Sequence, residues 1–390
     1  MRGSMPGIFH VRTKVICGLG CSSRVGEEVL ALGVSRVFVV TDRGVAESGI
    51  IQYVLSSLEA SGVTYTLFDG TEPEPSATLM DGVAKQIVEA GAEGVVAVGG
   101  GSSLDTGKAA AVVASNGGSI LDFVGEGKVR KPPLPVVSLP TTAGTGSEVT
   151  WHISVNDTAS KKKVTVRSPL CATDVALLDP QLLASVPPRV AAATGIDALA
   201  HCVESYVSTR GAWQLTDLLA AEGIRLVGKF LRPFVANRSN VEAAEGMLLA
   251  ALFGGMCLSH ARTGIGHQMA RPLGARYHIP HGLANALVLP YVMRHAWCSN
   301  PAKYAQVAKL LGERVEGLSE VEAARMAAEA VGRLCCDVGL PTTLREVGVA
   351  EDSLPELAQD AMQGRPEVDN PIQGGFEDVL AIYRSAFRGE

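Results

Sequence analysis

The feature that most constrains the fold is an alternation of short hydrophobic runs and amphipathic helical patterns that fills the first half of the chain. Runs rich in β-branched residues predict strands, and apolar residues that recur every three to four positions predict the helices between them. The expected strands are 36–41, 65–69, 94–100 and 134–140, and the expected helices are 47–62, 76–91 and one that includes 104–115. Because each strand is hydrophobic along its length, we expect a parallel sheet covered on both faces.

The periodicity changes at the adjacent prolines Pro187 and Pro188, which neither helix interiors nor strand interiors accommodate. Beyond them strand signals are few, and segments with a 3.6-residue period dominate at 189–209, 213–236, 241–259, 282–296, 318–338 and 374–388. The leading "MRGSM" is typical of an expression leader followed by a native start at Met5. We therefore expect an α/β domain over 5–186 and an all-helical domain over 187–390.

Charge, cysteine content and apolar runs narrow the function classes. The 390-residue chain carries a net charge of −6 and has no basic block longer than 161–163, which argues against a nucleic-acid partner. Its eight cysteines form no C-x-x-C pair, as in a protein of the reducing cytoplasm. The longest uncharged apolar run, 247–258, is too short to cross a bilayer, so no membrane partner is expected.

Three consecutive glycines at 99–101 stand between an expected strand and an expected helix. Glycine lets the backbone approach a ligand closely, and a helix N-terminus offers unbonded N–H groups, so this loop is suited to a pyrophosphate. A tight turn that binds nothing is the alternative. An ATP-binding P-loop is disfavoured, because Ser102 replaces its first glycine and Ala109 follows Lys108. The loop follows the third strand and not the first, so any dinucleotide fold would be a variant of the usual one.

Two further segments have cofactor-binding chemistry. Asp42 ends an early strand, where a carboxylate accepts hydrogen bonds from a ribose and repels a 2′-phosphate, which favours NAD over NADP. A turn-forming aspartate is the alternative. The segment 139–150, rich in Thr, Gly and Ser, also follows a strand and offers hydroxyls and N–H groups to a phosphate, a ribose or the nicotinamide amide.

Asp197 and His201 lie four positions apart in an apolar helical segment and therefore share one face. A structural hydrogen bond is the more common use of such a pair. His267 and His281 follow in a glycine-containing stretch, and one carboxylate with three imidazoles makes a suitable ligand set for Fe(II), Zn or Ni. The donor types do not choose among these metals.

Four segments in this order, 99–109, 140–150, 193–208 and 264–286, closely resemble the iron-containing (group III) alcohol dehydrogenase family, and the resemblance runs from about residue 10 to residue 388. It implies a Rossmann-like N-terminal α/β domain with a mostly parallel sheet and an all-helical C-terminal domain. This is the architecture of dehydroquinate synthase, with an active site in the cleft between the domains. The resemblance also implies a homodimer, because members of the family often associate through an edge region of the α/β domain. The cysteine pattern indicates a cytoplasmic protein.

The resemblance assigns residues to a metal and to a cofactor. The implied ligands of an Fe2+ ion, with Zn2+ or another divalent metal as alternatives, are Asp197, His201, His267 and His281. The implied NAD(H) contacts are Gly99, Gly100, Gly101, Ser102, Asp105, Thr141, Thr142, Ser147 and Lys163, with Asp42 favouring NAD(H) over NADP(H).

The implied reaction interconverts a small alcohol with its aldehyde or ketone. A divalent cation stabilises the charge on the substrate oxygen while the nicotinamide exchanges a hydride. His267 and His281 then serve catalysis as ligands, and no protein nucleophile is required. His278 is a candidate for the proton path, with a surface imidazole as the alternative.

Arg271 departs from the family pattern, because many members have a histidine four residues after the third ligand. A guanidinium does not exchange protons near neutral pH. We expect Arg271, with His152 as a second pocket residue, to favour a substrate that carries a carboxylate, phosphonate or sulfonate group. Pairing of Arg271 with a cofactor phosphate or an acidic neighbour is an equal alternative.

Other activities of the same superfamily stay open. A glycerol dehydrogenase-like polyol oxidase and a hydroxyacid–oxoacid transhydrogenase both agree with the motifs. The complete aspartate and histidine set argues against a metal-free maleylacetate reductase-like enzyme, and dehydroquinate synthase-like lyases use a different ligand set. The intact set also argues against a non-catalytic nucleotide sensor.

Overall fold

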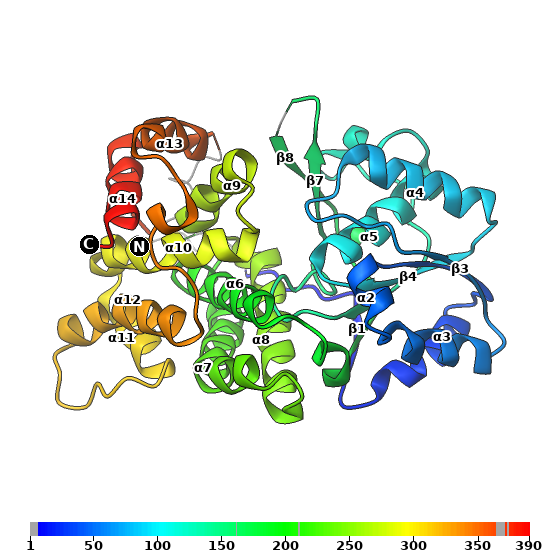
Figure 1. Cartoon of the computed structure of the whole chain (residues 1–390), viewed down its shortest axis with the longest axis horizontal. Helices are drawn as coiled ribbons and strands as arrows, with labels where there is room; N and C mark the ends of the chain where they lie inside the picture. The colour runs from blue at the N-terminus through cyan, green and yellow to red at the C-terminus, as the bar shows by residue number, and fades with distance from the viewer. Residues whose placement is uncertain (1–6, 161, 210, 364–370, 373) are drawn as a thin grey trace. The chain divides into compact units, whose positions relative to one another are not determined.

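The computed structural model describes residues 7–160, 162–209, 211–363, 371–372 and 374–390. The segment assigned to an expression leader, and the expected start at Met5, lie outside the described residues. The chain divides into two compact units: an α/β unit of residues 11–186 and 238–248, and a helical unit of residues 7–10, 187–237 and 249–390. Figure 1 draws the first 186 residues in blue to green and the later helices in green to red.

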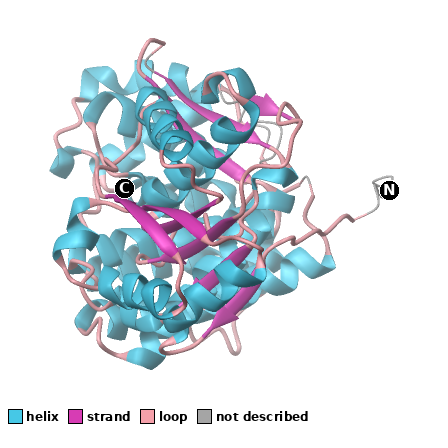
Figure 2. Ribbon diagram, turned by 90° about the vertical axis from the view of Figure 1, so that its right-hand side faces the viewer, coloured by secondary structure: helices cyan, strands magenta, loops and turns pink. Residues whose placement is uncertain are grey.

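The α/β unit is built on one sheet of six parallel strands in the order β1-β9-β6-β4-β2-β3. From β1 to β4 the bounds are Lys14–Cys17, Arg36–Val40, Thr64–Phe68 and Gly94–Gly99, and β6 and β9 are Val136–Pro140 and Val175–Leu178. Figure 2 shows helices on either side of the strands. The predicted mostly parallel sheet is confirmed.

Four of these strands, β2, β3, β4 and β6, agree with the sequence prediction to within two residues. β4 is buried at every position, as expected for a central strand that is covered on both faces. The sequence analysis missed β1 and β9, each only four residues long. A run of that length carries too little periodicity to stand out from its surroundings.

Helices α1 to α5 belong to the α/β unit, with the bounds Val25–Ala31, Arg43–Glu47, Ile51–Ala60, Ala77–Glu89 and Gly101–Asn116. The helix predicted over 47–62 is confirmed as α3, which begins four residues later than predicted, and α2 before it is absent from the sequence prediction. Gly49 takes a φ of +80° between α2 and α3, a left-handed conformation that ends the first helix. Short 3-10 turns lie at Cys21–Arg24, Ile120–Phe123, Pro169–Cys171 and Pro180–Leu183.

A second, three-stranded sheet in the order β5-β8-β7 is absent from the sequence prediction. Its strands are Gly125–Glu126 (β5), His152–Asp157 (β7) and Lys162–Arg167 (β8). β7 pairs antiparallel with β8, and β5 pairs parallel with β8. Polar residues interrupt both long strands, so a search for hydrophobic runs does not find them.

Close packing of α5 on β4 fixes the glycine loop between them. A Cβ atom added at Gly107 would lie 2.8 Å from the Ala97 Cβ, so only glycine allows the helix this close to the strand. Gly99 turns the chain out of β4 with a φ of +150°. The loop is therefore held at the carboxyl end of β4, where parallel sheets bind ligands.

The regular elements described between residues 187 and 390 are all helices, as predicted. The α-helices from α6 to α10 are Pro188–Val207, Gln214–Ala236, Val241–Ala261, Ile265–Tyr277 and His281–Ala296. Those from α11 to α14 are Pro301–Leu310, Glu320–Asp337, Leu354–Met362 and Phe376–Arg388. The sequence analysis missed α9, α11 and α13, and 3-10 turns add Trp297–Ser299, Arg345–Val347 and Glu351–Ser353.

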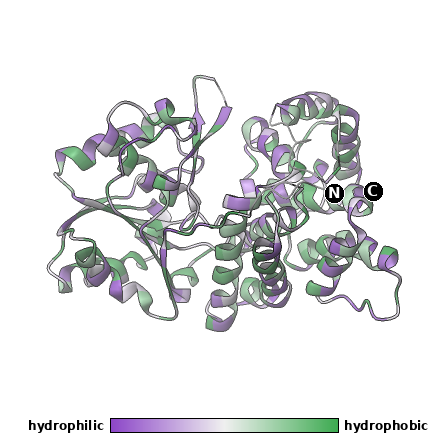
Figure 3. Cartoon of the chain, turned by 180° about the vertical axis from the view of Figure 1, so that it is seen from behind, coloured by the Kyte–Doolittle hydropathy of each residue, from purple (hydrophilic) through white to green (hydrophobic). Residues whose placement is uncertain are grey.

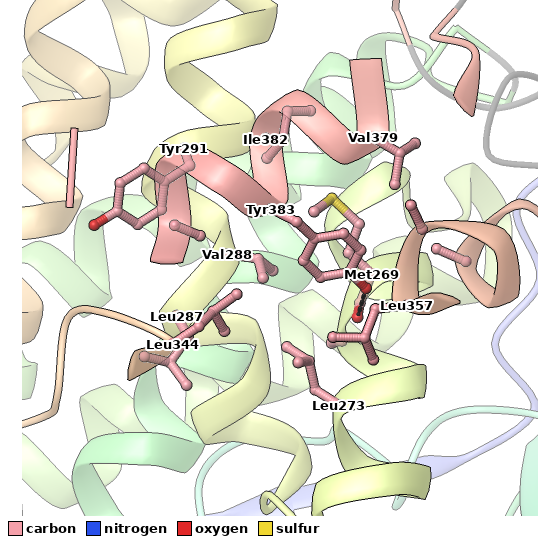
Figure 4. Packing of buried hydrophobic residues seen from close by; sticks show 14 of the residues in the cluster. Met269, Leu273, Leu287, Val288, Tyr291, Leu344, Leu357, Val379, Ile382 and Tyr383 are labelled. Carbon is pink, nitrogen blue, oxygen red and sulfur yellow. Dashed lines mark hydrogen bonds between the residues drawn. The ribbon is translucent and has the colours of Figure 1, made fainter. Parts of the chain in front are cut away.

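One hydrophobic core holds α9 and α10 against α13 and α14 in the helical unit. Figure 4 shows Leu273, Leu287 and other buried side chains of this core. The Tyr383 hydroxyl donates a hydrogen bond to the Met269 carbonyl at 2.6 Å, which ties α14 to α9. α9 and α10 carry His267 and His281, so this core fixes two of the predicted metal ligands.

Most helices show both hydrophobic and hydrophilic stretches in Figure 3, as expected for helices that cover a core. One described helix, α8, is long and apolar enough to cross a membrane by length and composition alone. It includes the apolar run 247–258. However, 61% of its most apolar window is buried inside the protein, which is typical of a core helix.

Candidate functional site

One face of α6 carries three buried polar side chains. Asp197, His201 and Glu204 stand at positions i, i+4 and i+7 of this helix and are 1%, 4% and 5% exposed. Pro188 suits the first turn of the helix, where no backbone N–H is required. The polar face of an otherwise apolar helix is thus buried inside the helical unit.

The starts of α9 and α10 bring two more imidazoles to this face. His267 is the third residue of α9, and His281 is the first residue of α10. α10 can approach α6 closely because residue 282 is glycine: an added Cβ would lie 2.5 Å from the Ala193 carbonyl oxygen. His267 and His281 follow Asp197 by 70 and 84 positions in the sequence, and the fold places them next to it.

Asp197, His267 and His281 each offer one ligand atom, and these atoms all lie within 4.8 Å of one another. The Asp197 Oδ1 is 3.8 Å from the Nε2 of His267 and 3.8 Å from the Nε2 of His281. These separations are too long for hydrogen bonds. They are close to the ~3.4 Å that separates two ligands of a tetrahedral ion with bonds of ~2.1 Å.

His201 belongs to the same cluster by its ring. The His201 and His267 ring centroids are 4.6 Å apart, and those of His267 and His281 are 5.5 Å apart. All four predicted ligands therefore converge in the helical unit. Asp197, His267 and His281 have the mutual spacing of a metal site, and His201 lies beside them.

The donor set suits a divalent cation. His267 Nε2 is buried and has no hydrogen-bond partner among the described residues. A buried polar atom left without a partner is costly, unless the site holds a group absent from the coordinates. A carboxylate with neutral imidazoles is a ligand chemistry for Fe(II) and Zn. The residues present therefore fit the metal that the sequence predicts.

Two buried residues that the sequence analysis did not single out also contact the cluster. Glu204 lies 2.5 Å from His267 Nδ1, and Asn285 donates a hydrogen bond from Nδ2 to Asp197 Oδ1 at 2.7 Å. Asn285 is 1% exposed and lies one turn after His281. A glutamate inside an apolar helix, on the face shared by two predicted ligands, is the sequence signal that could have identified Glu204.

The side chains of the cluster shift the pKa values of its two carboxylates, Asp197 and Glu204. Burial tends to raise the pKa of Asp197, but the His201, His281 and His267 imidazoles and the Asn285 hydrogen bond outweigh it and lower that pKa. Burial likewise opposes the ionisation of Glu204, while His267 and two backbone N–H groups lower its pKa. Both carboxylates are therefore held as buried anions.

In the α/β unit, the predicted cofactor loops contact each other. The Thr141 N–H donates to the Gly99 carbonyl at 3.0 Å, which links the loop after β6 to the loop after β4. A Cβ added at Gly101 would lie 2.7 Å from Thr145, and one at Gly100 would lie 3.3 Å from Thr142. The loop with Gly99, Gly100, Gly101 and Ser102 thus lies against the loop with Thr141 and Thr142 where α5 begins.

Asp42 lies next to this region. Its Oδ1 accepts the Val45 N–H at 3.0 Å, so it caps α2, and its Oδ2 accepts the Ser103 hydroxyl at 3.2 Å. The sequence alternatives, a turn aspartate and a cofactor-binding aspartate, are therefore compatible: the cap fixes the carboxylate beside the glycine loop.

Asp105 and Ser147, two of the predicted cofactor contacts, bind each other. The Ser147 hydroxyl donates to Asp105 Oδ1 at 2.5 Å, and the Ser154 N–H donates to Oδ2 at 2.9 Å. Lys108 Nζ lies 3.0 Å from the same Oδ1. The structure thus engages both oxygens of Asp105 within the protein.

The remaining predicted residues are spread over the chain. Lys163 pairs with Glu74 at 2.6 Å in the α/β unit, and His152 begins β7. In the helical unit, Arg271 is partly buried in α9, four residues after His267. His278 is exposed and ends α9 in a left-handed conformation with a φ of +54°.

Comparisons with known proteins match both parts of the chain. The family model "Iron-containing alcohol dehydrogenase" matches residues 12–180, and "Fe-containing alcohol dehydrogenase family, C-terminal" matches residues 191–387. The 1,3-propanediol dehydrogenase of Klebsiella pneumoniae is 39% identical over 373 residues, which cover 95% of this chain and 96% of that protein. The lactaldehyde reductase of Escherichia coli (strain K12) is 37% identical over 372 residues, which cover 95% and 97%.

A solved structure extends the likeness to the fold. The crystal structure of a 1,3-propanediol oxidoreductase matches with a TM-score of 0.95 at 38% identity, over 98% of this chain and 100% of that one. The chain therefore belongs to the iron-containing alcohol dehydrogenase family and is an oxidoreductase.

Proposed function

We propose that this enzyme reduces a short-chain aldehyde with NADH, and catalyses the reverse oxidation, with a divalent cation held by Asp197, His201, His267 and His281. The observation that carries the proposal is the convergence of Asp197, His267 and His281, whose ligand atoms lie within 4.8 Å of one another. The buried Nε2 of His267, which has no hydrogen-bond partner among the described residues, supports the proposal. Fe2+ is the metal we propose, with Zn2+ as the alternative.

We propose that residues 5–186 form the nucleotide-binding domain and residues 187–390 the metal-binding domain. The contacts between the loops after β4 and β6 support a pyrophosphate position at the N-terminus of α5. Asp42, fixed beside that loop, supports NAD(H) over NADP(H), because its carboxylate would repel a 2′-phosphate. Lys163, which pairs with Glu74, is a further proposed cofactor contact.

When bound, the cation would withdraw electron density from the carbonyl oxygen, and the reduced nicotinamide would supply the hydride. Asp197 contributes the negative charge of the ligand set, and the imidazoles contribute neutral nitrogens. The His281 side chain is 27% exposed and those of Asp197 and His267 are 1% and 6% exposed, so substrate would approach on the His281 side. The other ligands stay shielded from water. His278, exposed near that side, is our candidate for proton exchange with solvent.

The relatives support a small, hydroxylated substrate. Two proteins that are 37% to 39% identical over 95% of this chain are named for 1,3-propanediol and lactaldehyde, both three-carbon compounds that carry a hydroxyl group. We therefore propose a three-carbon hydroxyaldehyde and the matching diol as the substrate pair.

The test is a steady-state assay of NADH oxidation with hydroxyaldehydes and unsubstituted aldehydes, on protein whose metal content is measured. We expect turnover to depend on the metal, to be lost on chelation, and to return on addition of Fe2+ or Zn2+. Full turnover after complete demetallation would contradict the proposal.

Arg271 favours a second candidate substrate class, aldehydes that carry an anionic group. It follows His267 by one helical turn and so faces the same side of α9. We propose that its guanidinium favours aldehydes with a carboxylate, phosphonate or sulfonate group, with His152 as a second contact. The Arg271→Ala variant should lose about tenfold or more in kcat/KM for an anionic aldehyde and little for a neutral one of equal size. Equal losses on both substrates would refute this role.

We also propose a cytoplasmic homodimer that associates through an edge of the six-stranded sheet. The edge strands β1 and β3 each pair with one strand among the described residues, which leaves one side of each available. Sedimentation equilibrium tests the stoichiometry, and a monomer at micromolar concentration would contradict it.

A further inference from the structure

Glu204 is a buried carboxylate that faces only hydrogen-bond donors in its described contacts. Its Oε2 accepts the Gly264 N–H at 3.0 Å and lies 2.5 Å from His267 Nδ1. Its Oε1 accepts the Gly266 N–H at 2.6 Å. The residue is 5% exposed, so water does not compete for these contacts. Glu204 is therefore fixed at the N-terminus of α9, where a negative charge is stabilised.

These contacts decide which nitrogen of His267 carries a hydrogen. A carboxylate only accepts hydrogen bonds, so the hydrogen between Glu204 and His267 belongs to Nδ1. A neutral imidazole with Nδ1–H has its lone pair on Nε2. That Nε2 is buried, has no hydrogen-bond partner among the described residues, and lies 3.8 Å from Asp197 Oδ1.

We propose that Glu204 is a positioning residue, which holds His267 in the Nδ1–H tautomer and orients its ring so that Nε2 faces Asp197. The value of this arrangement rests on the proposed metal site, because a lone pair on Nε2 is what a cation requires. The tautomer itself does not depend on bound metal. Glu204 also caps α9, so one side chain fixes both the start of the helix and the ring that the helix carries.

Gly266 gives a second way to disturb the same contact. A Cβ atom added at this position would lie 2.7 Å from Glu204 Oε1, so a side chain there must displace the carboxylate. The Gly266→Ala variant therefore keeps the charge of Glu204 but moves it. It complements Glu204→Ala and Glu204→Gln, which remove the charge.

The first experiment reads the tautomer in metal-free protein labelled with 15N-histidine, by the NMR shifts of the two ring nitrogens at pH 8. The His267→Gln variant assigns the signal. We expect His267 to be the Nδ1–H tautomer in the unmodified protein and to shift toward Nε2–H in Glu204→Ala and Gly266→Ala. An Nε2–H tautomer in the unmodified protein, or an unchanged ring in Glu204→Ala, would overturn the proposal.

The second experiment measures Co2+ affinity by chelator competition, together with the visible spectrum of bound Co2+. Loss of an orienting carboxylate typically costs about 10- to 100-fold in metal affinity. We expect a loss of that size in Glu204→Ala, and a smaller one in Glu204→Gln because the amide oxygen still accepts the His267 N–H. Glu222→Gln, at an exposed glutamate of the same unit that pairs with Arg225, is the matched control and should bind Co2+ normally.

The two experiments separate this inference from the proposed function. If the unmodified protein binds no Co2+ but His267 is the Nδ1–H tautomer and responds to Glu204→Ala, the metal proposal fails and the role of Glu204 stands. If Co2+ binds and neither the tautomer nor the affinity changes in the Glu204 variants, the role of Glu204 fails and the metal proposal stands. A purely structural role for Glu204 would lower stability without changing the tautomer of the folded protein.

Discussion

Replacing Lys108 by methionine should destabilise the α/β unit, because this lysine is a buried structural cation. Its side chain is 0% exposed, and Nζ lies 3.0 Å from Asp105 Oδ1, 2.9 Å from the Ser147 carbonyl and 2.8 Å from the His152 carbonyl. An ammonium group has three hydrogens, so these three acceptors satisfy it. Lys108 thus ties α5 to both ends of the segment 147–152. It is not turned outward like the lysine of a P-loop.

The magnitude follows from what the substitution leaves behind. Methionine has a similar length but no charge, so Asp105 loses its cationic partner in a site where its side chain is only 13% exposed. Breaking a buried ion pair from one side typically costs ~3–5 kcal/mol. We expect a loss in that range for Lys108→Met. The double variant Asp105→Asn with Lys108→Met should recover part of it, because no unpaired charge remains.

The assay is urea unfolding followed by tryptophan fluorescence in a Trp213→Phe and Trp297→Phe background. Trp151 is then the only tryptophan and lies in the α/β unit, so its emission reports the unit that Lys108 stabilises. NADH affinity is measured in parallel. A destabilisation below about 1 kcal/mol combined with a large loss of NADH affinity would refute the reasoning and assign Lys108 to phosphate binding.

Three further variants test separate parts of the account. His267→Ala should abolish metal binding and lower turnover by at least about 100-fold, while NADH binding, measured by fluorescence, stays unchanged; retained stoichiometric metal would contradict the ligand role. Asp42→Asn keeps the helix cap but removes the charge, so KM for NADPH should fall by about tenfold or more; an unchanged NADPH/NADH ratio would reject Asp42 as the selector. Burial raises the pKa of the Glu148 carboxyl from 4.5 to about 7, so folding favours the protonated form of this side chain. The stability that comes from this preference is complete below pH 4.5 and is lost as the pH rises through 7. Glu148→Gln should therefore be more stable than the unmodified protein at pH 8, by up to ~3 kcal/mol, but not at pH 5; equal differences at the two pH values, measured by urea unfolding, would contradict this.

The sequence predicts the parts of the fold whose signals are local. The buried strands β2, β4 and β6 are continuous hydrophobic runs, and Pro187 and Pro188 mark the start of α6. By contrast, β7 and β8 interleave polar with apolar residues and so contain no continuous hydrophobic run, and the structure pairs them with each other. The start of α3 is predicted four residues too early, because the left-handed φ of Gly49, which separates α2 from α3, is visible only in the structure.

The same distinction explains the site. The helical spacing of Asp197 and His201 alone favours a structural hydrogen bond. The prediction that both are metal ligands comes from His267 and His281 in a second stretch and from the resemblance of the motifs. Glu204 was missed because its partners, at 264, 266 and 267, are about 60 residues away along the chain.

Asp105 was predicted to contact the cofactor, and the structure adds a role that the sequence does not reveal. Its partners Ser147 and Ser154 belong to a segment more than 40 residues away, and only the folded chain brings them within hydrogen-bond distance. An acidic side chain in a cofactor motif is therefore engaged in holding the neighbouring loop.

We propose that four side chains from three helices bind one cation. Anomalous diffraction at the metal absorption edge, on crystals grown from protein loaded with Fe2+ or Zn2+, tests it most directly. We predict one peak per chain, about 2.0–2.2 Å from an Asp197 oxygen and from a ring nitrogen of each of His201, His267 and His281. A fully loaded crystal with no peak among these four residues, or with the peak elsewhere in the chain, would contradict the account.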